Sequence, residues 1–84
     1  MKHQPIYQNN TVFVQIKLAV AMYIRVELIN VLGQNLGVVH NERHLPGDYM
    51  IDLNPQQKKY SAGQYIYRII TNGKAYSKSV VFVK

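Results

Sequence analysis

The stretch QYIYRIITNGKAYSKSVVFV, residues 64–83, decides the fold because two β-rich runs flank the dipeptide Asn72-Gly73. Asn-Gly is the strongest short signal for a β-hairpin, since both central residues of a type I′ turn need positive φ. A two-residue hairpin centred there sets cross-strand pairs. The predicted pairs are Ile69 with Tyr76, Tyr67 with Lys78, and Tyr65 with Val80. One face of this hairpin is therefore predicted to be aromatic and aliphatic.

Upstream of this hairpin, every even position from Val12 to Leu28 is apolar, and the odd positions between them include charged and polar residues. This period of two is typical of a strand. The run exceeds the usual strand length of roughly 3–10 residues, so we expect a break around residues 19–23. A three-residue loop, a bulge or an arch between two sheets would keep the parity. The alternative is one unbroken strand shared with a second molecule, which would give a homodimer by strand exchange.

Turn signals divide the rest of the chain. Gly33-Gln34 follows the alternating run, residues 36–40 favour a short strand, and Pro46-Gly47-Asp48 indicates a turn before a strand at 49–53. A polar connection then leads to the final hairpin. About six to seven short antiparallel strands without an amphipathic helix predict an all-β, immunoglobulin-like β-sandwich. We assign residues 11–84 to this domain and residues 1–10 to a linker or an extension that precedes it.

Composition limits the functional classes. The chain has 84 residues and no cysteine, so it is one small domain without a disulfide, a thiolate nucleophile or sulfur ligands for a metal. The formal charge of +6 is typical of proteins that bind nucleic acids, but the basic residues are spread along the chain. We therefore expect no nucleic-acid partner. No signal peptide or membrane-spanning helix is expected, because polar residues interrupt the apolar stretch 12–32.

No constellation for catalysis is visible. The four carboxylates are Glu27, Glu42, Asp48 and Asp52, and none is paired for acid–base chemistry. The serines Ser61, Ser77 and Ser79 stand in loop or strand contexts without a nucleophile elbow. We therefore predict that the domain is not an enzyme and has no catalytic residue.

A metal site is one hypothesis for the alternating residues His40, Glu42 and His44. If that segment were extended, the three side chains would share one face. We favour an exposed polar loop, because no further protein ligand is suggested nearby. The sequence is thus interpreted as holding no metal and no other cofactor.

Tyrosines interleaved with basic residues could stack on bases or sugars. The candidates for such contacts are Tyr65, Tyr67 and Tyr76. Strand tyrosines are more often half-buried pairing residues, and we prefer that interpretation.

The order of several motifs carries a resemblance to a known family. VELINVLGQNL (26–36), LPGDYMIDLN (45–54) and SAGQYIYRIITNGKAYSKSVVFVK (61–84) follow one another along the chain. Together they resemble the C-terminal sorting domain of bacterial type IX secretion (Por secretion system) cargo, over roughly residues 11–84. The motif residues are Asn30, Leu32, Gly33 and Gln34, then Pro46 and Gly47, then Ser61, Gly63, Tyr65 and Arg68, then Asn72 and Gly73, and finally Lys78, Val80 to Val83, and Lys84.

The resemblance implies a sorting signal without chemistry of its own. Such a domain lies at the C-terminus of a larger exported protein and directs it across the outer membrane to the cell surface or the medium. The implied partners are an outer-membrane shuttle or translocon component, and a surface sortase that removes the domain. The residues implied in recognition are Gly63, Tyr65, Arg68, Lys78, Val80, Val81, Phe82, Val83 and Lys84. The alternative function is an adhesive β-sandwich that binds carbohydrate or a host protein through Tyr65, Tyr67 and Tyr76.

Overall fold

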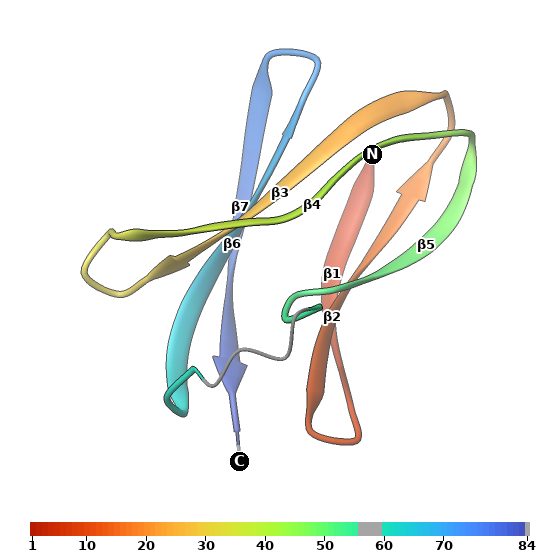
Figure 1. The fold of residues 1–84 in the computed structure, drawn as a ribbon. Helices are drawn as coiled ribbons and strands as arrows, with labels where there is room; N and C mark the ends of the chain where they lie inside the picture. Colours follow the sequence, from red (N-terminus) through yellow and green to blue (C-terminus); the bar gives the residue numbers. More distant parts are fainter. Residues whose placement is uncertain (56–59, 84) are drawn as a thin grey trace.

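The computed structural model describes residues 1–55 and 60–83, which form seven antiparallel strands and no helix (Figure 1). The strands are β1 (Lys2–Gln8), β2 (Thr11–Leu18), β3 (Met22–Asn30), β4 (Asn35–His44), β5 (Gly47–Asp52), β6 (Gly63–Thr71) and β7 (Lys74–Phe82). A three-stranded sheet has the order β1-β2-β5 and a four-stranded sheet the order β4-β3-β6-β7. The predicted all-β sandwich is confirmed. Within the described ranges there is accordingly no helix long and apolar enough to cross a membrane.

The hairpin β6–β7 forms as predicted. Asn72 and Gly73 have φ of 50° and 74°, the positive values that a type I′ turn requires. The three predicted pairs are present in the register: Ile69 opposes Tyr76, Tyr67 opposes Lys78, and Tyr65 opposes Val80. The even-numbered Tyr76, Val80 and Phe82 of β7 therefore pack in or against the core, whereas Lys78 on the same face is exposed and reaches β1. Odd-numbered residues face outward.

The long alternating run breaks where expected. Residues 19–21 separate β2 from β3, and these two strands lie in different sheets. The connection is thus the arch between two sheets, and even-numbered residues on both sides stay in the core. Val14 in β2 and Val26 in β3 are both fully buried. The unbroken strand is wrong for this structure, because the chain must turn to bring both apolar faces against one core. Strand exchange in a dimer stays a prediction.

Residues 2–8, within the segment assigned to a linker or extension, form a strand of the three-stranded sheet. β1 pairs with β2 from Gln8 opposite Thr11 to Lys2 opposite Lys17, through a turn in which Asn9 and Asn10 have positive φ. Pro5 fits because β1 lies at the edge of its sheet. The linker interpretation is therefore corrected for residues 2–8, whereas the boundary at residue 11 remains a prediction.

Strand β4 is longer than the predicted strand at residues 36–40, since it continues to His44. The segment expected to be an exposed polar loop is thus extended and paired with β3. Pairing is regular from Met22 opposite His44 to Val26 opposite His40, and then a bulge places Val39 as an extra residue.

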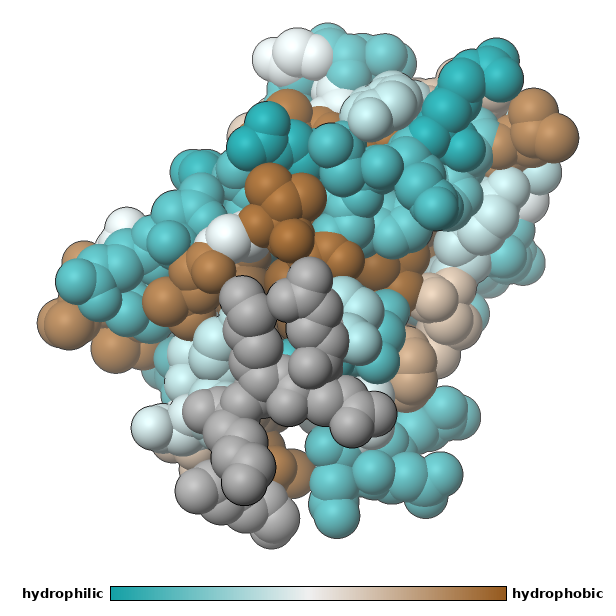
Figure 2. Space-filling view, viewed as in Figure 1, coloured by the Kyte–Doolittle hydropathy of each residue, from teal (hydrophilic) through white to brown (hydrophobic). Residues whose placement is uncertain are grey.

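The core lies between the two sheets. Its buried apolar residues are Val12, Val14, Ile16, Leu18, Ile24, Val26, Leu28, Ile51, Leu53, Tyr65, Tyr67, Ile69 and Val80. Most are the even positions of β2 and β3 and the odd positions of β6. On the surface, hydrophobic atoms gather at the tip of the β3–β4 hairpin (Figure 2), where Val31 and Leu32 are exposed. The core therefore follows the alternation of the strands.

Candidate functional site

The residues implied in recognition lie on the hairpin β6–β7. Gly63 begins β6, Lys78 and residues 80–82 belong to β7, and Val83 follows it. Lys84 lies outside the described residues. β7 is an edge strand of the four-stranded sheet, so within the described part of the chain one side of its backbone has no neighbouring strand in that sheet. An edge of this kind is a template for pairing with another chain.

Two of these residues are part of the core. Tyr65 is 8% exposed and Val80 is 1% exposed. The Tyr65 hydroxyl donates a hydrogen bond of 2.7 Å to the carbonyl of Ser61, and the Phe82 ring lies 4.6 Å from the Tyr65 ring. In the folded domain Tyr65 and Val80 hold the hairpin onto the core, and their side chains present no contact surface.

The exposed members of the set face solvent beside the β7 edge. Val81 is 47% exposed and Val83 is 55% exposed. Lys78 is also exposed, and its Nζ donates a 2.7 Å hydrogen bond to the carbonyl of His3 in β1. The backbone N–H of Val81 donates to the hydroxyl of Tyr7 at 3.2 Å. Side-chain and backbone groups of β1 thus reach toward β7, while the side chains of Val81 and Val83 remain available.

Arg68 is fixed by an ion pair that sequence reasoning missed. Its Nε and a terminal guanidinium nitrogen donate to the Glu27 carboxylate at 2.9 and 2.7 Å. Arg25 lies 2.9 Å from the other carboxylate oxygen, and the Glu27 side chain is only 5% exposed. A buried carboxylate needs such partners. Arg68 therefore ties β6 to β3, and only the register Glu27 opposite Arg68 could have revealed the pair.

This ion pair predicts a dependence of stability on pH. The hydrogen bond from Arg68 lowers the pKa of Glu27 below 4.5, against the opposing effect of burial. A lowered pKa stabilises the folded state at pH above 4.5, and this contribution disappears as the pH falls through the folded-state pKa. In urea unfolding, the stability gap between the wild type and Glu27→Gln should be constant well above pH 4.5 and shrink below it. A gap that widened toward acid would contradict the assignment.

The motif around Asn30 is structural. The Asn30 Oδ1 accepts hydrogen bonds from the backbone N–H groups of Leu32 and Gln34, both at 3.0 Å, and its Nδ2 donates to the Gln34 side chain at 2.8 Å. Gly33 has φ of 84°, which disfavours any residue with a Cβ. These contacts close the β3–β4 hairpin.

The second glycine motif lies between the sheets. Pro46 and Gly47 follow the end of β4, and Gly47 begins β5 in the three-stranded sheet. With φ of 149°, Gly47 adopts a conformation that side chains rarely take. This motif therefore shapes the passage from one sheet to the other.

The tyrosines proposed for adhesion do not form an exposed platform. Tyr67 is fully buried, Tyr65 is nearly so, and Tyr76 is partly buried against the core. The Tyr67 hydroxyl is hydrogen-bonded to Nδ1 of His3 at 2.8 Å, and burial raises the pKa of Tyr67 to about 12, so the hydroxyl stays protonated. The adhesive interpretation is wrong in naming Tyr65 and Tyr67 as contact residues, because both rings are buried between the sheets.

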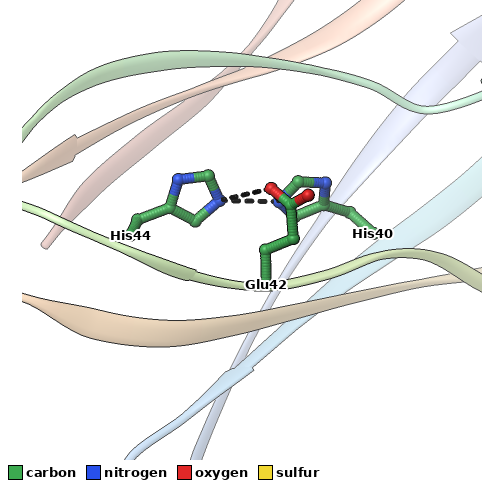
Figure 3. Close-up of side chains that lie close together, drawn as sticks. All are labelled: His40, Glu42 and His44. Carbon is green, nitrogen blue, oxygen red and sulfur yellow. Dashed lines mark hydrogen bonds and ion pairs between the residues drawn. The ribbon is translucent and has the colours of Figure 1, made fainter.

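The structure brings together His40, Glu42 and His44, which lie on one side of β4 (Figure 3). Their ligand atoms are all within 4.8 Å of one another. Burial and the neighbouring His44 lower the pKa of His40, whereas Glu42 opposes this shift. The polar-loop interpretation is therefore wrong here, because the strand continues and aligns alternate side chains.

The chain matches no protein-family model, no curated protein and no solved structure. Its functional interpretation consequently depends on its own residues and their arrangement.

Proposed function

We propose that this domain is a sorting signal of type IX secretion, which directs a larger cargo protein across the outer membrane. The order of the sequence motifs supports this proposal. The observation that carries it furthest is the position of β7 at the edge of its sheet, with the side chains of Val81 and Val83 exposed. Among the described residues, the Val81 N–H at this edge is bonded to the Tyr7 hydroxyl and not to a strand, so an added strand would replace that single contact. No catalytic group is required, because the domain is recognised and then removed by a sortase.

Recognition is proposed to occur by strand addition. A component of the secretion machinery pairs its backbone with the edge of β7, and main-chain hydrogen bonds supply affinity. The exposed side chains of Val81 and Val83 then set the specificity, and the charge of Lys78 fixes the register. Arg68 has a different part in this scheme, because its guanidinium is already engaged by Glu27. It keeps β6 in place so that β7 is presented in one conformation.

The proposal predicts that an export assay depends on the end of β7. Residues 1–84 are fused to the C-terminus of a reporter that carries a signal peptide, in a bacterium with a type IX system. We expect surface delivery of this fusion and periplasmic retention of a version that ends at Ser79. Equal delivery of both fusions would contradict the proposal.

Because the shortened version also lacks the buried Val80, a charge reversal separates recognition from folding. Lys78→Glu is expected to reduce delivery, whereas Lys74→Glu, at the turn end of the same strand, is the matched control and should be delivered. Both variants should keep the circular dichroism spectrum of the parent. If Lys78→Glu were delivered like Lys74→Glu, the charge of Lys78 would have no part in recognition.

A further inference from the structure

Strand β4 carries three donor side chains at alternating positions on one face. His40, Glu42 and His44 oppose Val26, Ile24 and Met22 of β3 without a register shift between them. Alternate residues of a strand point to the same side and lie about 6.6 Å apart along the chain, so the backbones of His40 and His44 are about 13 Å apart with Glu42 midway. This spacing lets two imidazoles lean toward each other over the carboxylate between them, as Figure 3 shows.

The donor atoms already converge. The Nε2 atoms of His40 and His44 are 2.7 Å apart, and the Glu42 carboxylate lies 3.8 Å and 4.0 Å from them. One proton bridges the two nitrogens in this arrangement. Two nitrogens bound to a tetrahedral zinc ion are about 3.3 Å apart, from Zn–N bonds of about 2.0–2.1 Å. Small side-chain rotations would therefore let an ion replace the bridging proton and meet the carboxylate.

Neighbouring groups hold the two histidines in position. The His44 ring packs against Tyr49 of β5 with centroids 4.2 Å apart, and the Tyr49 hydroxyl donates to the Leu45 carbonyl at 2.6 Å. The bulge at Val39 stands directly before His40, and bulges redirect the side chains beside them. The side chains of His40 and His44 are only 19% and 10% exposed. The donors are thus oriented before any ion binds.

We propose that His40, Glu42 and His44 form a zinc-binding site through the two Nε2 atoms and the Glu42 carboxylate. Two imidazoles and one carboxylate are a donor set that zinc accepts readily, whereas calcium and magnesium prefer oxygen ligands. The proposal is independent of the sorting function, because it depends only on the geometry of β4.

The site is open on one side. The Glu42 side chain is 68% exposed, so an ion can enter from solvent without unfolding the strand. Three protein ligands leave a fourth tetrahedral position, which water fills in sites of this kind. Because all three ligands come from one edge strand, the ion does not join the two sheets. It instead presents an exchangeable coordination position at the surface.

The test is a zinc titration of the 84-residue protein against a chromophoric chelator, with cobalt as a spectroscopic probe. We expect one zinc ion per chain, a tetrahedral visible spectrum with cobalt, and no binding of magnesium or calcium. Because even the loss of a residue that only orients a ligand costs about 10- to 100-fold in affinity, His40→Ala should weaken zinc binding by about 100-fold or more. Glu42→Gln removes the carboxylate ligand at an exposed position and should also weaken binding.

The chain supplies a matched control in its remaining histidine, His3, which lies in β1 and contacts Tyr67. His3→Gln should bind zinc like the parent. His44→Ala also removes packing on Tyr49, so circular dichroism is recorded for every variant. If His44→Ala is unfolded, the zinc affinity of Glu42→Gln is used in its place to test the site. Affinity that is unchanged in His40→Ala and Glu42→Gln, or that is lost in folded His3→Gln, would overturn the proposal.

Discussion

Replacing Val80 with aspartate is expected to unfold most of the domain, whereas the same change at Val81 should leave it folded. Val80 is 1% exposed and packs in the core, so its replacement buries a carboxylate without a partner. We estimate a loss of about 4 kcal/mol or more, a large part of the roughly 5–15 kcal/mol that stabilises a whole domain. Val81 points to the outer face and is 47% exposed, so its carboxylate would remain hydrated.

Urea unfolding followed by circular dichroism measures this difference. The midpoint of Val81→Asp should lie close to that of the parent, and Val80→Asp should lack a folded baseline. A cooperative, nearly unchanged transition for Val80→Asp would show that β7 is not packed as described. The pair thus tests the alternation of β7 directly.

The second large effect is expected for Arg68→Gln. This change removes two hydrogen bonds to the Glu27 carboxylate, whose side chain is 5% exposed. Because hydrogen bonds to charged groups contribute about 1.5–3 kcal/mol, we expect the free energy of unfolding to fall by about 2–3 kcal/mol. The measurement is again urea unfolding, at pH 7.

Arg25→Gln is the matched control for this prediction. Arg25 contacts the same carboxylate through one ion pair, whereas Arg68 donates two hydrogen bonds to it. The Arg25 side chain is 47% exposed against 38% for Arg68, and an exposed ion pair contributes under about 1 kcal/mol. Equal losses for Arg25→Gln and Arg68→Gln would mean that the two arginines share the carboxylate evenly. A negligible loss of unfolding free energy for Arg68→Gln would mean that Arg68 does not stabilise the fold, and a direct part in recognition would then be the better explanation of this motif residue.

The central hairpin and the break in the run 12–28 could be predicted from local chemistry, whereas the choice of an arch between two sheets over a three-residue loop or a bulge could not. Asn72-Gly73 specifies a turn with two positive φ angles, and that turn alone sets the register of β6 against β7. The run 12–28 predicted two strands because its length exceeds that of one. In both cases the information lies within a few neighbouring residues.

Other features depend on pairing between distant segments. β1 contains Pro5 and several polar residues, so only its place at a sheet edge makes it a strand; the turn at Asn9 and Asn10 was the available signal. The ion pair of Glu27 with Arg68 spans 41 positions and follows from the register of β3 with β6. No local pattern contains that register.

The prediction of a polar loop at His40, Glu42 and His44 was wrong for a different reason. Alternation at His40, Glu42 and His44 was visible, but polar composition favoured a loop. Pairing with β3 keeps this segment extended to His44. Only the tertiary context, and not the local sequence, specifies this pairing. The end of β4 was thus set by its partner strand.

The measurement that tests the sorting proposal most directly is surface delivery of two fusions, Val81→Asp and Ala75→Asp. Both changes place a carboxylate on the exposed outer face of β7, one near each end of the strand. We predict that Val81→Asp is folded but retained in the periplasm, while Ala75→Asp is delivered like the parent. Normal delivery of Val81→Asp would contradict recognition at this end of β7.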